Sequence, residues 1–259
     1  MPADPETVNS YDQQAAKWAK RQREGSSIAH QYLEKPAIYA KLPDLTGKSV
    51  LCLGSGSGEE CDYLMKLGAA KVVGVDVSKG LIEQAKYAYP DVQFEVMDIE
   101  RLDFEKNSFD FVYSSLVLHY VQDWQNVLKP LYHILKNDGK FLFSTHHPIK
   151  WGAEVSQDQN QRKTLIGFSR SEDESFKIYG DYLNSRMITE NLIDKLKVSY
   201  YHKPFAEIFS EIRSSGFEII DMLEPKAEIG AKNERLSFYE IHQKIPLFVI
   251  FELAKKVLN

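Results

Sequence analysis

Apolar and polar positions follow two different periods along residues 49–147 of this 259-residue chain. Five runs are nearly continuous in apolar residues, as in strands that are covered on both faces: 49–54, 71–77, 92–98, 109–115 and 140–147. Between them, apolar residues recur every three or four positions, which predicts helices over 57–68, 78–89 and 123–136. Strands that alternate with helices predict βαβ units, so we expect an α/β fold with a parallel sheet.

The regions that flank this alternation have other patterns. Helical spacing predicts helices over 9–24, 27–42 and 204–216, and two late apolar runs predict strands over 217–225 and 245–256. About 55 residues between the fifth strand and residue 204 break the alternation, and connections of this length are often lids or binding loops. We therefore divide the chain into an N-terminal helical lid (1–46), a core (47–148), an insert or cap (149–203) and a C-terminal completion of the sheet (204–259).

Three glycines in five positions follow the first strand, in "VLCLGSGSGEE" (50–60). Glycines at such a turn let a ligand touch the backbone next to a helix N-terminus. A dinucleotide site would need a further glycine where Glu59 stands, and Glu59 and Glu60 would repel a pyrophosphate. The loop therefore favours a ligand that carries an ammonium group and no phosphate, such as S-adenosylmethionine.

The next two strands end in acidic residues. Asp76 lies about 20 residues after Gly54, where a carboxylate can bind both hydroxyls of a ribose. Asp98 and Ile99 end the third strand, where an acid and a backbone N–H can bind an adenine edge. Aspartate is also a common turn residue at strand ends, which is the alternative for both acids. Three successive strand ends in this order favour an adenosine-containing cofactor.

With these segments the chain resembles the class I S-adenosylmethionine-dependent methyltransferases of the type 11 small-molecule group. The similar segments are "VLCLGSGSG", "VVGVDVS", "VMDIERLDFEKNSFDFVYSSLVLHYVQDW" and "ILKNDGKFLFSTHHP". The resemblance implies a Rossmann-like, doubly wound sheet of seven strands, of which the last, over 245–256, is antiparallel. It also implies which residues bind the cofactor: Gly54, Ser55 and Gly56 at its methionine part, and Asp76, Val77, Asp98, Ile99 and Ser114 around the remainder.

One position departs from the family pattern. The family usually has an acid two residues before the first glycine, where this chain has Cys52. Glu59 and Glu60 are the candidates to replace that acid. Members of the family often close N-terminal helices over the cofactor, and Tyr11 and Trp18 share one face of the first predicted helix. These two aromatic residues are therefore candidate lid residues, with packing against the domain as the alternative.

Methyl transfer from a sulfonium needs alignment, and it needs a base only where the acceptor loses a proton. Candidate bases follow the fourth strand, end the fifth strand and close the insert: His119, His146, Tyr201 and His202. The insert is also rich in aromatic residues, namely Phe168, Phe176, Tyr179, Tyr182, Tyr200 and Tyr201. We therefore expect O-, N- or C-methylation of a small acceptor that is partly hydrophobic or aromatic.

Composition narrows the remaining alternatives. The net charge of −5 argues against nucleic acid, and the late apolar run "IPLFVIF" is far too short to span a membrane. The two cysteines and the histidines lack metal-ligand spacing, so we expect no metal and a reduced, cytoplasmic setting. A regulatory protein that binds the cofactor without catalysis stays an alternative. A nucleic-acid methyltransferase and a nicotinamide oxidoreductase are weaker alternatives.

Overall fold

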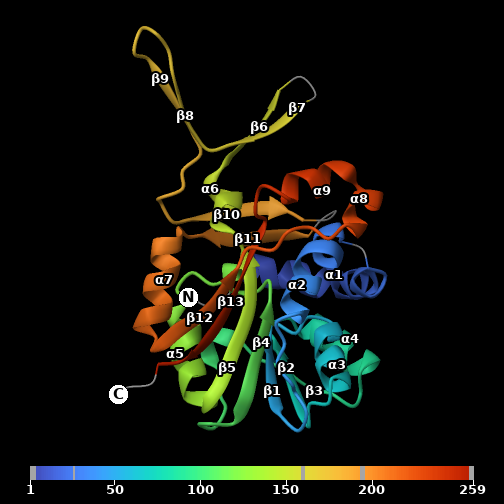
Figure 1. Ribbon diagram of the computed structural model, residues 1–259. Helices are drawn as coiled ribbons and strands as arrows, with labels where there is room; N and C mark the ends of the chain where they lie inside the picture. Colours follow the sequence, from blue (N-terminus) through green and yellow to red (C-terminus); the bar gives the residue numbers. More distant parts are fainter. Residues whose placement is uncertain (1–3, 26, 159–160, 193–195, 257–259) are drawn as a thin grey trace.

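A seven-stranded sheet forms the centre of the protein in the computed structural model, which describes residues 4–25, 27–158, 161–192 and 196–256. Its strands have the order β12-β13-β5-β4-β1-β2-β3 (Figure 1). Their bounds are β1 (Ser49–Leu53), β2 (Lys71–Asp76), β3 (Gln93–Val96), β4 (Phe109–Ser115), β5 (Leu135–His146), β12 (Phe217–Leu223) and β13 (Phe248–Lys255). Strands β1 to β5 pair in parallel, whereas β13 is antiparallel to both β5 and β12. The predicted seven-stranded sheet with an antiparallel last strand is therefore confirmed.

Helices cover both faces of this sheet, because successive side chains of a strand point to opposite sides. Leu51 and Leu53 of β1 belong to the cluster that α5 and α7 cover, and Val50 and Cys52 to the cluster under α2, α3 and α4. The helices are α2 (Lys35–Tyr39), α3 (Glu59–Lys66), α4 (Lys79–Ala88), α5 (Gln125–Ile134) and α7 (Phe205–Ser214). Figure 1 shows the two groups on opposite sides of the sheet, as a doubly wound fold requires.

The first helix begins earlier than its apolar spacing predicts. Helix α1 spans Pro5–Arg23, and the predicted helix began at residue 9. The carboxylate of Asp4 caps the helix by accepting a hydrogen bond from the Thr7 amide at 3.2 Å. A proline at the first helical position and an aspartate before it are a favourable start, so the capping signal outweighs the apolar period here.

Two other predicted helices also differ in detail. The helix predicted over 27–42 contains a π-helical turn, η1 (His30–Glu34), which leads into α2. The helix predicted to reach residue 136 ends at Ile134, because Leu135 already pairs with Phe109 of β4. The last two residues that helical spacing predicts for α5 therefore belong to strand β5.

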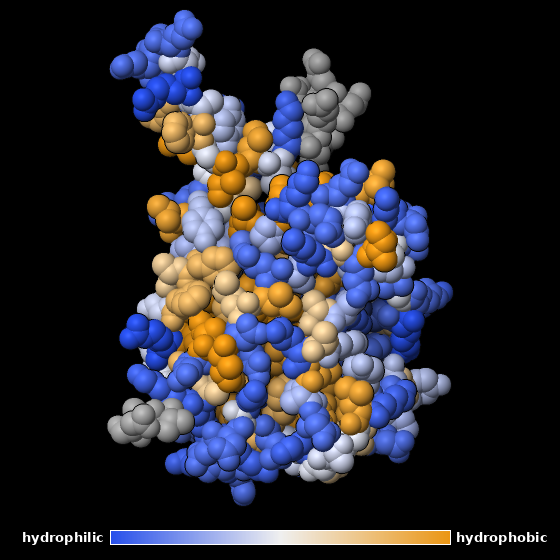
Figure 2. Space-filling view, viewed as in Figure 1, coloured by the Kyte–Doolittle hydropathy of each residue, from blue (hydrophilic) through white to orange (hydrophobic). Residues whose placement is uncertain are grey.

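The described residues of 149–203 contain most of a short helix and three separate pairs of antiparallel strands. Their elements are α6 (Pro148–Gly152), β6 (Glu154–Asp158), β7 (Gln161–Leu165), β8 (Gly167–Arg170), β9 (Phe176–Tyr179), β10 (Arg186–Asn191) and β11 (Lys197–His202). The hairpin β10–β11 lies across the carboxyl end of the sheet, whereas β8–β9 stands clear of the body (Figures 1 and 2). Phe168 and Phe176 of β8–β9 are 72% and 68% exposed, so they do not line a pocket as we expected; Tyr200 of β11 is buried.

Short elements complete the chain: η2 (Ile99–Arg101), η3 (Leu118–Tyr120), α8 (Gly230–Glu234) and α9 (Leu236–His242). Elements η2 and η3 follow β3 and β4, so they lie at the same carboxyl edge as the glycine loop. Within the part of the chain that the structure describes, no helix combines the length and the apolar character needed to cross a membrane.

Candidate active site

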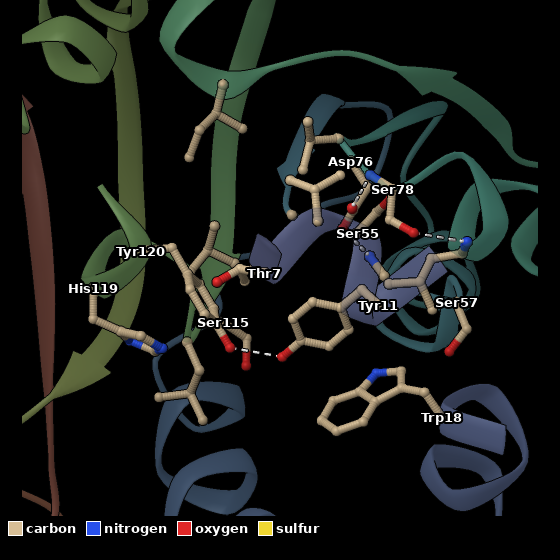
Figure 3. Close-up of a pocket in the computed structure, with 18 of the residues that line it drawn as sticks. Thr7, Tyr11, Trp18, Ser55, Ser57, Asp76, Ser78, Ser115, His119 and Tyr120 are labelled. Atoms are coloured by element: carbon tan, nitrogen blue, oxygen red, sulfur yellow. Dashed lines mark hydrogen bonds between the residues drawn. The ribbon is translucent and has the colours of Figure 1, made fainter. Parts of the chain in front are cut away.

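A cavity of about 370 Å³ opens at the carboxyl ends of β1, β2, β3 and β4. Helix α1 contributes to its wall from the other side (Figure 3), and Tyr200 of strand β11 also lines it. Parallel strands bring their following loops to one edge, which is where open α/β sheets bind ligands. The cavity also has the volume of a small-molecule site, for which about 300–1,000 Å³ is usual.

Helix α1 is fixed over this cavity at two places. Near its middle, Asp12 Oδ1 accepts a hydrogen bond from Ser78 Oγ at 2.6 Å, which ties it to the start of α4. Near its beginning, Thr7 Oγ1 accepts a hydrogen bond from the Ser199 amide at 2.9 Å, which ties it to β11. The N-terminal helix therefore bridges the cofactor edge of the sheet and the last hairpin of the insert.

The glycine loop has the close approach that its sequence indicates. Gly54 has φ +63° and Gly56 has φ +53°, a left-handed conformation that other residues rarely adopt. A Cβ on Gly54 would lie 2.3 Å from Val117 Cγ2, so this glycine is needed for packing inside the protein. A Cβ on Gly56 would meet no protein atom within 4 Å, and Gly56 lines the cavity. Gly56 is therefore the glycine that leaves room for a ligand.

Asp76 connects the glycine loop to the start of α4. Its Oδ2 accepts a hydrogen bond from the Gly56 amide at 2.9 Å, and its Oδ1 accepts one from the Ser78 amide at 2.8 Å. Burial raises the pKa of Asp76, and these two amides oppose the shift. A carboxylate has about four acceptor positions, so beside the amides of Gly56, Ser78 and Val77 the Asp76 carboxylate retains acceptor capacity for the hydroxyls of a ribose.

The other predicted cofactor residues divide into two groups. Ser55, Val77, Asp98 and Ile99 line the cavity. Asp98 also accepts a hydrogen bond from the Glu100 amide at 3.0 Å. This residue therefore stabilises a turn and lines the cavity at the same time. Ser114 does not line the cavity: it is fully buried, and its Oγ donates to the Leu53 carbonyl at 3.2 Å. Ser115 takes that place, because neighbouring residues of β4 face opposite sides of the sheet.

Aromatic hydroxyls line the far side of the cavity. The Tyr11 and Tyr120 hydroxyls lie 2.6 Å apart, and Trp18 meets the Tyr11 ring edge to face at 5.3 Å between ring centroids. Tyr120 is hydrogen-bonded to Tyr200, and Tyr200 to Glu190. A carboxylate only accepts, so Tyr200 donates to Glu190, Tyr120 to Tyr200 and Tyr11 to Tyr120. The Tyr11 oxygen therefore retains the capacity to accept a hydrogen bond from a ligand.

Two predicted histidines lie together at this side. The rings of His119 and His146 stack with centroids 3.8 Å apart and an angle of 14° between their planes. Both line the cavity, and Figure 3 shows the His119 ring directed into it. Burial lowers the pKa of both rings well below the usual range, so both are neutral at physiological pH.

The hydrogen bonds of His146 determine its tautomer. Trp151 Nε1–H donates to His146 Nδ1 at 3.0 Å, so the ring proton is on Nε2. His146 Nε2 lies 3.1 Å from Lys150 Nζ, and the ring N–H can donate to this nitrogen only when Lys150 is a neutral amine. Burial lowers the pKa of Lys150 to about 8, so the neutral amine is more accessible than in an exposed lysine, although the ammonium still predominates at pH 7. His146 thus has both ring nitrogens engaged.

Tyr201 and His202 do not line this cavity, which corrects our expectation that they converge on the reacting methyl group. His202 is buried, and its Nε2 donates to the Tyr182 carbonyl at 2.9 Å. Both residues line a second cavity of only about 10 Å³. Tyr200 is the residue of β11 that reaches the main cavity, because alternate side chains of a strand face opposite ways.

The residues at or beside the cavity that sequence patterns missed include Glu34, Ser115, Lys150 and Trp151. Strand alternation in β4 was the available signal for Ser115, whereas the other three carry no local pattern that distinguishes them from surface charges or packing residues. Among the described residues, no group of three or more histidine, cysteine, aspartate or glutamate side chains is arranged to hold a metal ion.

Comparison with known proteins supports the fold and the cofactor. Residues 51–143 match the family model described as a methyltransferase domain. A solved S-adenosylmethionine-dependent methyltransferase from Mesorhizobium loti is 27% identical, with a TM-score of 0.69, and the match covers 87% of this chain and 97% of that one. A Listeria monocytogenes structure assigned to the same enzyme class is 28% identical, with a TM-score of 0.72, over 86% and 97% of the two chains.

Curated relatives differ in how much of their length the match covers. An uncharacterized protein of Haemophilus influenzae is 28% identical over 206 residues, which are 76% of this chain and 77% of that protein. Rat arsenite methyltransferase is 35% identical over 134 residues, which are 46% of this chain and only 36% of that enzyme. The chain thus contains a methyltransferase domain and has the fold of the class I S-adenosylmethionine-dependent methyltransferases, which implies S-adenosylmethionine as its cofactor.

Proposed function

We propose that this protein transfers the methyl group of S-adenosylmethionine to a small, uncharged acceptor with aromatic or hydrophobic parts. The observation that carries this proposal is the contrast between two ends of one cavity. Ser55 of the glycine loop and Asp76 lie at one end, and Tyr120 and His119 lie at the other (Figure 3); Asp98 and His146 also line the cavity. A cofactor at the first end would present its methyl group toward the second.

The residues at the first end suit the cofactor. Gly56 leaves space beside the backbone, Asp76 has acceptor positions left for the ribose, and Asp98 with Ile99 would hold the adenine. When bound, S-adenosylmethionine supplies an electrophilic methyl group on a sulfonium, a leaving group that needs no acid. The contribution of the chain is then mainly alignment, for which well-oriented reactants gain about 7–11 kcal/mol.

The second end favours an uncharged acceptor. His119 and His146 are neutral, and burial raises the pKa of Tyr11 and Tyr120, so these groups stay protonated. An ionised acceptor would lose its hydration here without gaining an opposite charge, which is costly. Cys52 and Cys61, the two cysteines of the chain, are buried in the core and do not line the cavity, so thiols take no part in the proposal.

A protic acceptor needs a group that takes its proton. His146 has no free lone pair, because Nδ1 accepts from Trp151 and Nε2 carries the ring proton. We therefore assign the base to His119, which faces the cavity, and a positioning role to His146, which stacks on it. The Tyr11 oxygen would accept a hydrogen bond from the acceptor and orient it toward the methyl group.

Two measurements test the proposal. Calorimetry should detect binding of S-adenosylhomocysteine and no binding of NAD. Incubation with methyl-labelled S-adenosylmethionine and a small-molecule extract should transfer label to at least one metabolite. Binding without any transfer would instead favour a regulatory protein that uses the cofactor as a ligand, and tight binding of NAD alone would contradict the family assignment.

A further inference from the structure

Several buried polar atoms without a hydrogen-bond partner lie in the cavity wall or in side chains near Glu34. Among the described residues, the side chains of His30, Glu34, Ser55 and Tyr113 each contain such an atom. His30 and Ser55 line the cavity, and the charge of Glu34 acts on Tyr113. Unpartnered buried polar atoms are costly and uncommon in folded proteins, so those of His30 and Ser55 in the cavity wall point to a polar ligand.

Glu34 lies on the face of the sheet from which an acid is missing. Cys52 of β1 stands directly opposite Tyr113 of β4, and Ser115 is two residues further along β4, on the same face. Glu34 Oε1 accepts hydrogen bonds from Ser115 Oγ at 2.9 Å and from Ser144 Oγ at 2.5 Å. The Glu34 carboxylate is therefore above the Cys52 row, toward the cavity end of the strands.

The position of Glu34 is also linked to the backbone that borders the cavity. Ser144 Oγ, which donates to Glu34, accepts a hydrogen bond from the Leu116 amide at 3.1 Å. Leu116 lines the cavity and has φ +56°, a conformation that a leucine adopts only when its surroundings hold it. Glu34 itself comes from a π-helical turn, a feature that is frequent at functional sites.

A second carboxylate, that of Glu60, faces the same region. It lines the cavity at the start of α3 and forms an ion pair with Lys35 at 3.0 Å. Burial raises the pKa of Glu34 to about 7, the two serine hydroxyls oppose this shift, and the charge of Glu60 adds to it. Lys35, Tyr39 and Tyr113 are the other titratable groups that face Glu34. A further positive charge between the two carboxylates would favour the ionised form of Glu34.

We propose that Glu60 and Glu34 together receive the positively charged amino group of the cofactor's methionine end, in place of the acid that is absent at Cys52. Glu60, in the cavity wall, is the residue that touches this group. Glu34 is a positioning residue, which acts through Ser115 and supplies the second negative charge. The inference rests on the proposed function only in its choice of S-adenosylmethionine as the ligand.

Two ligands separate this role from a general effect on the fold. S-adenosylhomocysteine carries the amino-acid end, and 5′-methylthioadenosine has the same adenosine and thioether without it. By calorimetry, Glu60→Gln should weaken S-adenosylhomocysteine about 10- to 150-fold, the usual effect of losing a hydrogen bond to a charged group. It should change the affinity for 5′-methylthioadenosine less than twofold. Asp62→Asn is the matched control, because it removes a charge from the same first turn of α3 outside the cavity wall.

Proton release provides a second readout, which concerns Glu34. At pH 7, calorimetry in phosphate and in Tris buffer should show that the native protein releases up to about half a proton per S-adenosylhomocysteine bound. The same measurement with 5′-methylthioadenosine should show none. Glu34→Gln, which keeps the shape of the side chain, should lose most of this release, and Glu34→Asp should retain part of it.

The outcomes separate this inference from the proposed function. Equal weakening of both ligands, or unchanged affinity for S-adenosylhomocysteine in Glu60→Gln, would overturn the role of the carboxylate pair. Proton release that persists in Glu34→Gln would overturn the part assigned to Glu34. If the native protein binds neither S-adenosylhomocysteine nor 5′-methylthioadenosine, the proposed function itself is contradicted. Thermal unfolding of each variant checks that it is folded. If Glu34→Gln does not fold, Glu60→Gln still tests the proposal, because Glu60 is partly exposed and its substitution perturbs the core less.

Discussion

Replacing Gly56 by alanine tests whether a ligand occupies the space beside the glycine loop. The new Cβ would enter a region with no protein atom within 4 Å, at a backbone φ of +53°. Gly47 is a matched control, because its φ is +72° and a Cβ there also meets nothing within 4 Å. Gly47 precedes β1, at the opposite end of the sheet from the cavity, so no cofactor role is assigned to it.

Both substitutions should lower the stability of the fold by a similar amount, because both place alanine in a left-handed conformation. Only Gly56→Ala should also lower the affinity for the cofactor. A left-handed conformation costs an alanine about 1–2 kcal/mol, which for a chain of this size lowers the unfolding temperature by about 2–8 °C. A methyl group forced into a packed contact costs about a further 1–3 kcal/mol. If the cofactor packs against Gly56, Gly56→Ala should therefore weaken its binding about 5- to 150-fold, with Gly47→Ala close to the native affinity.

Calorimetry with S-adenosylhomocysteine and thermal unfolding, each on both variants, measure these quantities. The expected pattern is a similar loss of thermal stability in the two variants and a loss of affinity in Gly56→Ala alone. If Gly56→Ala binds S-adenosylhomocysteine as tightly as the native protein while its stability falls, the cofactor does not approach this glycine. The assignment of the loop to the methionine end would then be wrong.

Three further predictions concern Asp76, His119 and Glu34. Asp76→Asn should weaken S-adenosylhomocysteine at least about 100-fold, because two charge-assisted ribose hydrogen bonds of about 1.5–3 kcal/mol each are lost. Asp110→Asn, which removes a carboxylate that also accepts a backbone hydrogen bond but lies at the start of β4, should change stability alone. Once an acceptor is known, His119→Gln should lower its methylation about 100- to 10,000-fold with cofactor affinity intact. His202→Gln should have little effect on methylation. A loss comparable to that of His119→Gln would instead indicate that His202 takes part in catalysis. The folded pKa of Glu34, about 7, exceeds its unfolded value of 4.5, so the folded protein binds the extra proton between these values. The free energy of unfolding should therefore fall as pH rises from about 4.5 to 7, by at most about 1.4 kcal/mol per pH unit, and denaturant titrations of Glu34→Gln should show a flatter profile.

Features that depend on neighbours in the chain could be predicted from the sequence. The strands of the core and their alternation with helices follow from apolar period, which is a local property. The glycine loop could be placed because it follows a predicted strand, and Asp76 because it lies at the end of the next one. Parallel strands bring such positions to one edge of the sheet. The antiparallel last strand came from family resemblance rather than from period, and the structure confirms it as β13.

Features that depend on a single register step or on distant contacts needed the tertiary structure. Tyr200 lines the cavity and Tyr201 does not, just as Ser115 lines it and Ser114 does not, because one residue along a strand reverses the face. The contact between Glu34 and Ser115 joins residues 81 positions apart, and no local pattern encodes it. The exposed rings of β8–β9 resemble pocket residues in the sequence, yet a hairpin that stands clear of the body has nothing to bury them against. The chain therefore determines its elements and its cofactor edge locally, whereas packing between distant elements decides which side chains reach the reacting centre.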